Sequence, residues 1–189
     1  MPPPFTSFAF IFLVIFSLPI YWLLNRKTFL QNLYLLIVSY IIYCFITYWI
    51  GIVLFISTLI NYISGLSLGR LKRNWLRKLI LYSGVIFNVV YLFVFKFFDF
   101  FSQEISNFLG LFGLKTTPVL LYLILPIGIS YYTLQAISYN IEIYRNEIEP
   151  VRNFIVFALF LTYFPKMTAG PIEKPQNLIP QFFEKKTLD

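Results

Sequence analysis

The segment from Leu125 to Arg145, LPIGISYYTLQAISYNIEIYR, combines polar side chains with an apolar setting. Its first part reads as an apolar helix broken by Pro126 and Gly128, and its second part carries polar residues such as Gln135 and Asn140. Polar side chains in a membrane span usually face a protein interior or a water-filled cavity. The chain has no histidine, so it offers no Ser-His or Cys-His pair and no histidine-bearing metal site. We therefore expect this segment to lie inside a larger membrane body and to have no acid-base role.

The eight carboxylates add little material for catalysis. Glu142, Glu147 and Glu149 lie together in NIEIYRNEIEPVRN, and none of the acids is centred in an apolar block. We expect these three to form a solvated loop, because nothing in their surroundings provides the dry setting that paired catalytic carboxylates use. No catalytic residue and no metal ligand is assigned.

Lys96 and Asp99 in VFKFFDFF are three residues apart and share a helix face. One interpretation is a lysine that reaches the lipid headgroups and pairs with the aspartate. The other is an inward cation that holds an anionic group. The sequence leaves both open.

A second irregular run, FPKMTAGPIEKP, covers residues 164–175. Three prolines and a Gly-Pro pair in twelve residues prevent a regular helix. Irregular backbone at membrane depth persists only where protein or water satisfies it. The run is either an exit loop or a re-entrant segment that lines a cavity, with its turn at Gly170 and Pro171.

The composition indicates an integral membrane protein. Of the 189 residues, 59% are hydrophobic and only 12% are charged, whereas soluble domains are about one-quarter charged. The net charge of +7 comes from short basic runs between apolar blocks, a pattern that fits anionic headgroups rather than nucleic acid. The single cysteine, Cys44, lies in the apolar run IIYCFI and is expected to be a small buried side chain.

The apolar blocks predict an all-α polytopic membrane protein with about six transmembrane or re-entrant helices. Thr28 to Gly69 is uncharged for 42 residues and is interpreted as two spans that meet near 47–51. Residues 99–115 have apolar side chains at helical spacing and predict an amphipathic helix in the interface. The remaining predicted spans are Phe5 to Leu24, Leu79 to about Phe98, Pro118 to Ile141, and a short one from Val151 to Phe164.

The distribution of Lys and Arg predicts the topology. With the N-terminus outside, the loops at 25–28, 70–78 and 142–152 lie in the cytoplasm and hold nine basic residues, against two on the opposite side before the tail. We therefore expect a multi-pass protein of the cytoplasmic membrane, with residues 1–189 forming a single membrane domain.

The two irregular runs carry a resemblance. LPIGISYYTLQAISYNIEIYR followed by FPKMTAGPIEKP resembles the N-terminal part of the membrane-bound O-acyltransferase family, in the branch of the alginate O-acetyltransferase membrane subunit and the D-alanyl transferase of teichoic acid synthesis. SYIIYCF, NYISGLSLG and FKFFDFF fit the same pattern in order, so the resemblance covers essentially the whole chain.

The resemblance implies a helical bundle with a tunnel. An acyl group, with acetyl the expected one, would pass from a cytoplasmic donor such as acetyl-CoA or an acyl carrier protein to an envelope polysaccharide or polymer outside. A periplasmic or extracellular acyltransferase partner and the C-terminal part of the same enzyme are further implied, with no bound cofactor. The family's essential histidine lies in a later segment, so this chain alone is expected to be inactive.

On this resemblance, the matched residues would shape the tunnel. Pro126 and Gly128 would break the fifth helix, and Tyr131, Gln135 and Asn140 would present polar groups inward. Two other classes remain open on the sequence alone, which are a small membrane transport module and a non-catalytic membrane scaffold. A transporter should show an inverted internal repeat, and none is visible.

Overall fold

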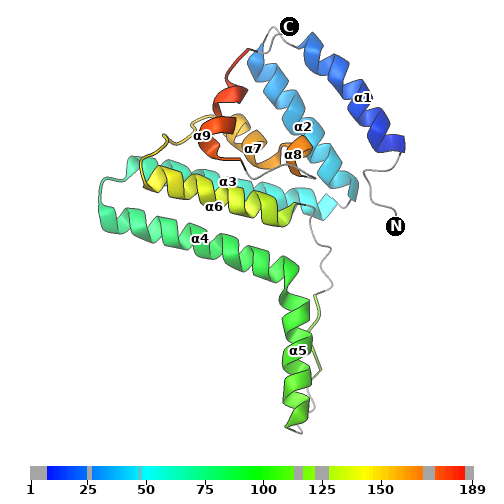
Figure 1. Ribbon diagram of the computed structural model, residues 1–189, viewed down its shortest axis with the longest axis vertical. Helices are drawn as coiled ribbons and strands as arrows, with labels where there is room; N and C mark the ends of the chain where they lie inside the picture. The colour runs from blue at the N-terminus through cyan, green and yellow to red at the C-terminus, as the bar shows by residue number, and fades with distance from the viewer. Residues whose placement is uncertain are drawn as a thin grey trace.

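The computed structural model describes residues 8–24, 27–46, 48–112, 117–121, 128–167 and 173–185. This part of the chain is helical and contains no strand (Figure 1). Its elements are α1 Phe8–Leu23, α2 Thr28–Ile46, α3 Tyr48–Arg70, α4 Asn74–Lys96, α5 Phe98–Leu111, α6 Ile129–Tyr144, α7 Phe154–Thr162, α8 Phe164–Met167, α9 Pro175–Leu178 and a short 3-10 helix, η2, Pro180–Phe182.

Two described helices have the length and hydropathy to cross a membrane, namely Trp49–Arg70 of α3 and Asn74–Lys96 of α4. The uncharged run from Thr28 to Gly69 does divide into two helices, α2 and α3, as predicted. Residues 8–23 and 98–111 are also helical where the sequence predicted helices. Helix α4 begins at Asn74, five residues before the predicted span. Its first turns therefore include the basic residues Arg77 and Lys78.

The predicted broken span from Pro118 to Ile141 is helical from Ile129 onward, and the expectation of a helix is wrong for residues 118–121. Residues 117–121 are not helical, residues 122–127 lie outside the described residues, and α6 begins only at Ile129. Gly128 precedes α6 with a φ of 73°, a left-handed conformation that glycine adopts without a steric cost. The break expected at Pro126 falls outside the described part of the chain.

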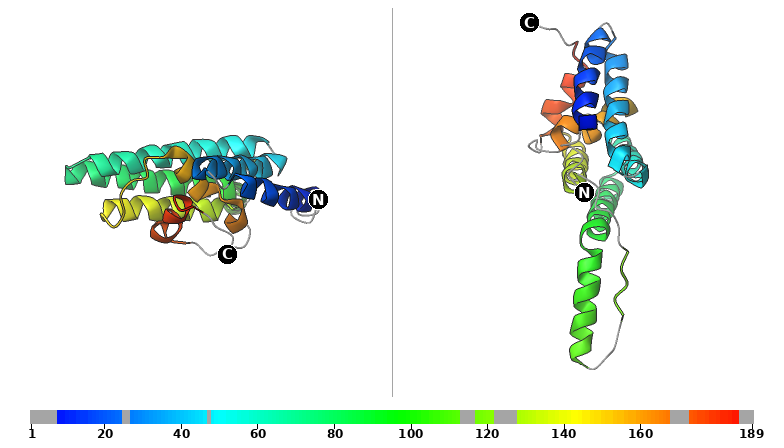
Figure 2. Two further views of the ribbon diagram at one scale, coloured as in Figure 1. Left: turned by 90° about the horizontal axis from the view of Figure 1, so that it is seen from above. Right: turned by 90° about the vertical axis from the view of Figure 1, so that its right-hand side faces the viewer.

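Helix α3 lies at the centre of the fold and contacts α2, α4, α6 and α7. Helices α3, α4 and α6 run side by side, and each contacts the other two (Figures 1 and 2). A Cβ at Gly65 would meet the ring of Tyr139, and one at Gly84 would meet the hydroxyl of Ser64. Small residues thus let these helices approach closely, as in other membrane helix pairs.

Helix α7 is short, with nine residues, and it fills the core of the described body. All residues from Val156 to Thr162 are buried, as expected of a helix that is hydrophobic all round. Asn153 caps its start, where the side-chain oxygen accepts from the backbone N–H groups of Ile155 and Val156. Helix α7 packs against α2, α3 and α6.

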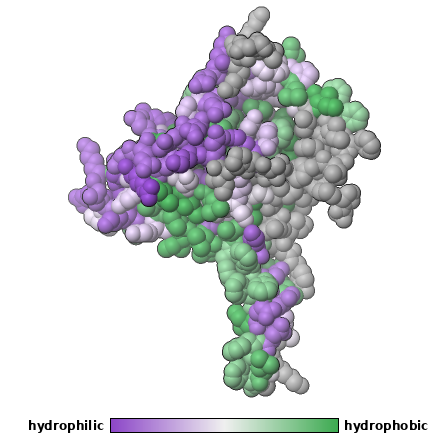
Figure 3. Space-filling model, in the orientation of Figure 1, coloured by the Kyte–Doolittle hydropathy of each residue, from purple (hydrophilic) through white to green (hydrophobic). Residues whose placement is uncertain are grey.

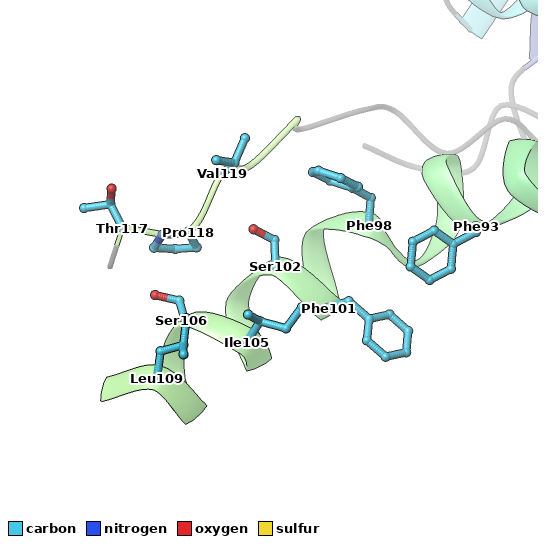
Figure 4. A pocket seen from close by; sticks show the side chains of 10 residues that line it. All are labelled: Phe93, Phe98, Phe101, Ser102, Ile105, Ser106, Leu109, Thr117, Pro118 and Val119. Atoms are coloured by element: carbon cyan, nitrogen blue, oxygen red, sulfur yellow. The ribbon is translucent and has the colours of Figure 1, made fainter. Parts of the chain in front are cut away.

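Helix α5 projects away from the helical body, with residues 117–121 running back beside it (Figures 1 and 2). A cavity of about 340 Å³ lies between this segment and α5, with Phe101, Ile105 and Pro118 among the residues that line it (Figure 4). None of the α5 residues is buried. The arm therefore exposes an apolar helix to its surroundings, and the prediction that it lies in the membrane interface is not tested by the fold.

Hydrophobic and hydrophilic surfaces are separated. Hydrophobic side chains gather on α5 and along the nearby edge of the body, and hydrophilic ones gather at the end where α3 passes into α4 (Figure 3). At this end, Arg77 of α4 donates to the carbonyl oxygens of Ile143 and Tyr144 at 3.0 and 2.8 Å. A cation at this position satisfies the free carbonyls and the negative end of the α6 dipole.

Candidate functional site

The candidate site is the polar interior formed where α6 packs between α3 and α4. Thr133, Gln135 and Asn140 of α6 are completely buried, as are Asn61 of α3 and Asn88 of α4. Buried amides are costly in an apolar body unless hydrogen bonds satisfy them. Their presence in three adjacent helices marks the interior that the sequence predicted for the segment from Leu125 to Arg145.

Three asparagines, one from each helix, form the centre of this interior. Asn88 Nδ2 donates to Asn61 Oδ1 at 2.8 Å, and Asn61 Nδ2 donates in return to Asn88 Oδ1 at 3.2 Å. Asn140 Nδ2 also donates to Asn61 Oδ1, at 3.0 Å. Backbone carbonyls of Ser57 and Gly84 accept further bonds from Asn61 and Asn88. The side-chain carbonyl of Asn61 therefore holds both neighbouring helices.

The Thr133 hydroxyl and the Oδ1 atom of Asn140, both on α6, have no hydrogen-bond partner among the described residues, and the amide of Gln135 lies within hydrogen-bonding reach of Tyr131. An unpaired buried polar group costs about 1–3 kcal/mol. Tyr131, which the sequence also assigned to the interior, is one turn before Gln135 and is half-buried. Thr133 and Asn140 are seven residues apart and share one side of α6, which therefore has hydrogen-bonding capacity beyond the network, whereas Gln135 and Tyr131 share another side.

Tyrosines surround the first half of α6. The hydroxyls of Tyr91 and Tyr132 lie 2.6 Å apart, and Tyr43 packs with Tyr132 in the same cluster. The hydroxyl of Tyr43 is buried without a partner in the described residues. This region is thus an aromatic cluster that contains several tyrosine hydroxyl groups.

Lys96 and Asp99 hold the junction between α4, α5 and the start of α6. Lys96 is exposed, and its ammonium donates to Ser130 Oγ at 3.3 Å. Asp99 Oδ1 accepts from the backbone N–H of Leu121 at 2.7 Å. Each side chain therefore ties a different part of the returning chain to the junction of α4 and α5, and the two interpretations drawn from the sequence stay open.

The structure thus brings some of the predicted residues together and separates others. Asn140 joins the asparagine network, Gln135 lies on the same helix, and Gly128 precedes that helix. Pro126, Gly170 and Pro171 lie outside the described residues. Sequence reasoning missed Asn61 and Asn88, although an amide in the middle of an apolar span was a usable signal for both.

Two other sequence interpretations are wrong. Glu142 was expected in a solvated loop, but it lies in α6 and is only 6% exposed, whereas Glu147 and Glu149 are exposed as predicted. Helix α6 packs against α9, and the backbone N–H of Gln176 in α9 reaches the carboxylate of Glu142. Cys44 was expected to be buried and is exposed, because its face of α2 does not turn toward the core.

Burial raises the pKa of Glu142 above its ordinary value, and the nearby Glu147 adds to this effect. The hydroxyl of Ser138 donates to Glu142 Oε1 at 3.1 Å, and Lys174 and the backbone N–H of Gln176 also favour the charged form. Desolvation is the largest of these effects. Glu142 is therefore an acid held at the hydrophilic end of the polar interior.

Replacing Asn61 with alanine should destabilise the fold by about 1–3 kcal/mol, because the amides of Asn88 and Asn140 would lose their shared partner. Unfolding of the purified chain in a mixed-detergent titration measures the change. A double-mutant cycle with Asn88→Ala should give a coupling energy of about 0.6–2 kcal/mol.

The matched control is Ser83→Ala on α4, which removes an exposed hydroxyl that bonds only to the carbonyl of Ile80. It should leave stability nearly unchanged. Additive effects of Asn61→Ala and Asn88→Ala would show that the network does not join the helices.

The raised pKa of Glu142 predicts a pH dependence. A folded-state pKa above the unfolded value gives stability that is complete below the unfolded pKa and is lost as pH rises through the folded pKa. Glu142→Gln removes this titration, so the variant's melting temperature should gain on that of the wild type as pH rises above 4.5, the ordinary pKa of glutamate. Glu104→Gln, at an exposed position of α5, is the control. A constant difference across this range would contradict the assignment.

The chain is similar to curated proteins over nearly its whole length. It is 36% identical to the probable alginate O-acetylase AlgI of Pseudomonas aeruginosa over 186 residues, which cover 93% of this chain and 33% of that protein. The identity to the probable alginate O-acetylase AlgI of Pseudomonas syringae is 37%, with 96% of this chain and 35% of that protein covered. The peptidoglycan O-acetyltransferase of Helicobacter pylori is 31% identical, with coverages of 96% and 38%.

The chain therefore spans about a third of the length of these relatives. No protein-family model and no solved structure matches it. The names of the relatives indicate O-acetyltransferase activity at the level of the family. This similarity confirms the resemblance drawn from the motifs, and the chain belongs with the O-acetylases of the membrane-bound O-acyltransferase family.

Proposed function

We propose that this chain is the N-terminal helical part of a membrane enzyme that transfers an acyl group, in this branch acetyl, to an envelope polysaccharide or polymer. The observation that carries the proposal is the identity of 31–37% to alginate and peptidoglycan O-acetylases over at least 93% of this chain. The donor would be cytoplasmic, such as acetyl-CoA or an acyl carrier protein. The acceptor would lie outside, presented directly or through a periplasmic or extracellular partner.

In this proposal the chain supplies the walls of the acyl path. Gln135 and Asn140 bring buried amides to two sides of α6, and Tyr131 lies one turn before Gln135. Amides and hydroxyls can accept or donate a hydrogen bond without changing charge. They can therefore orient a carbonyl or a hydroxyl while leaving proton transfer to another group.

The remaining matched residues would shape the entrance to the path. Pro126 and Gly128 would break the fifth span just before α6. Gly170 and Pro171 would form a re-entrant turn. Lys96 would sit at the same entrance, since it reaches Ser130 at the start of α6. The ion pair between Lys166 and Glu173 joins the two sides of the second irregular run, which supports a closed turn there.

The proposal includes a single membrane domain of about six transmembrane or re-entrant segments. Helices α3 and α4 would cross the bilayer, while the short α6 and α7 would be enclosed by the rest of the enzyme. This division is supported by the complete burial of α7 residues such as Phe157 and Leu159, and by the exposed apolar residues of α4 such as Ile86 and Val90.

The purified 189-residue chain should transfer no acetyl group. Attack by a hydroxyl needs a base for its proton, and a positioned base contributes about 10²–10⁴-fold. Histidine suits this task at neutral pH, and the chain has none. Release of acetyl from acetyl-CoA and acetylation of alginate oligosaccharide in liposomes measure the activity.

Co-expression of this chain with the remaining two-thirds of the Pseudomonas aeruginosa relative should restore alginate acetylation in cells. The complementing segment alone is the control and should be inactive. Robust transfer by the isolated chain would overturn the proposed division of labour, and failure of the restored pair to acetylate would count against a shared path.

The proposed topology has the N-terminus outside and the Arg70–Lys78 region in the cytoplasm. Asn74 begins α4 and is exposed, so a cysteine there, in a Cys44→Ser background, should react with an impermeant maleimide only after the cells are opened. The exposed Asn107 of α5 lies on the outer side in the proposed topology. Asn107→Cys should therefore react with the maleimide in intact cells. Labelling of the Asn74→Cys variant from outside would contradict the topology.

A further inference from the structure

A cavity of about 550 Å³ lies at the hydrophilic end of α3, away from the asparagine network. Its walls come from the last turns of α3 and from the loop that precedes α7. The hydroxyl of Tyr62 donates to the carbonyl of Arg152, and Gly69 lies against Pro150. These contacts fix the loop on the helix, so the hollow is a built feature of the fold. Its lining residues are Tyr62, Leu66, Gly69, Arg70, Glu149, Pro150 and Arg152.

The charges in the cavity favour a singly charged anion. The lining contains two cations, Arg70 and Arg152, and one anion, Glu149, so its net charge is +1. Lys72 and Arg73 follow on the adjacent loop and are exposed. Guanidinium groups bind phosphate oxygens in a planar, two-bond arrangement. A phosphodiester matches this charge and geometry.

An apolar stripe on α3 leads directly to the cavity. Ile52, Ile56, Leu59 and Ile63 are 40–54% exposed and recur at spacings of four and three residues. The next positions of the same series are Leu66 and Arg70, which line the cavity. Residues at this spacing share one face of a helix. The face is therefore apolar along its length and cationic at its end.

We propose that this face binds one anionic phospholipid, with its phosphodiester between Arg70 and Arg152 and an acyl chain along the stripe of α3. The site matches a phospholipid in shape as well as in charge. The cavity would hold the headgroup, and the exposed apolar stripe of α3 would contact the hydrocarbon chain. Leu66 and Pro150 form the apolar part of the hollow, where the glycerol backbone would lie. The site is separate from the polar interior on α6 and has no part in the proposed acyl path.

Native mass spectrometry of the full 189-residue chain, titrated with phosphatidylglycerol or phosphatidylcholine, tests the proposal. The chain should retain phosphatidylglycerol in preference to phosphatidylcholine. Arg70→Gln and Arg152→Gln should each weaken retention about fivefold, the factor that corresponds to about 1 kcal/mol per basic residue near an anionic surface. Leu66→Trp, which fills the hollow and leaves the charge unchanged, should weaken retention as well.

Arg73→Gln is the matched control, because Arg73 is exposed and does not line the cavity. It should retain most of the binding. An equal loss in Arg73→Gln would show diffuse attraction to the basic loop and would overturn the site. Displacement of the lipid by glycerol phosphate at equal concentration would assign the hollow to soluble phosphates, and equal retention of phosphatidylcholine would remove the charge argument. Unchanged binding in Leu66→Trp would likewise overturn the placement.

Discussion

The side-chain carbonyl of Asn61 is the acceptor on which the arrangement of the helical body depends. It receives Asn88 Nδ2 from α4 and Asn140 Nδ2 from α6, at 2.8 and 3.0 Å. In an apolar body the alternative for each amide is an unsatisfied polar group, which costs several times the net energy of the bond itself. Apolar contacts allow a membrane helix to rotate about its axis with little change in energy. The hydrogen bonds among the three asparagines form in only one rotation of each helix. This network therefore sets the rotation and the register of three helices at once.

The rest of the interior follows from that register. With Asn140 beside Asn61, Tyr139 falls next to Gly65, and its hydroxyl accepts from the backbone N–H of Val151 at 2.9 Å. This bond places the start of the segment that leads into α7, and the ring of Tyr139 packs on Phe157 with centroids 4.7 Å apart. A helix as short and as apolar as α7 has no position of its own in a bilayer. It is held because the neighbouring helices present a matched surface.

The sequence was sufficient to predict the helices whose signals are local. The uncharged run from Thr28 to Gly69 is too long for one span, and its division near residue 47 follows from length alone. Burial was predicted less well, because it depends on which face of a helix meets a neighbour. Glu142 and Cys44 show this in opposite directions, since the charged residue is buried and the apolar run exposes its thiol. Asn61 and Asn88 are 27 residues apart, and only the packed helices show that they bond.

The chemistry of α6 changes along its length. Its first turns carry Ser130, which binds Lys96, and Tyr132, which binds Tyr91, while its last turn carries Glu142. Between them the polar groups are the amides of Gln135 and Asn140 and the hydroxyls of Thr133, Ser138 and Tyr139, none of which gains or loses a proton near neutral pH. Such groups can hold and orient a polar group, but they cannot act as the base for an attacking hydroxyl. If the proposed acyl path follows the middle of α6, the proton is taken by a residue other than these, and the amides would set the orientation in which the acyl group meets it.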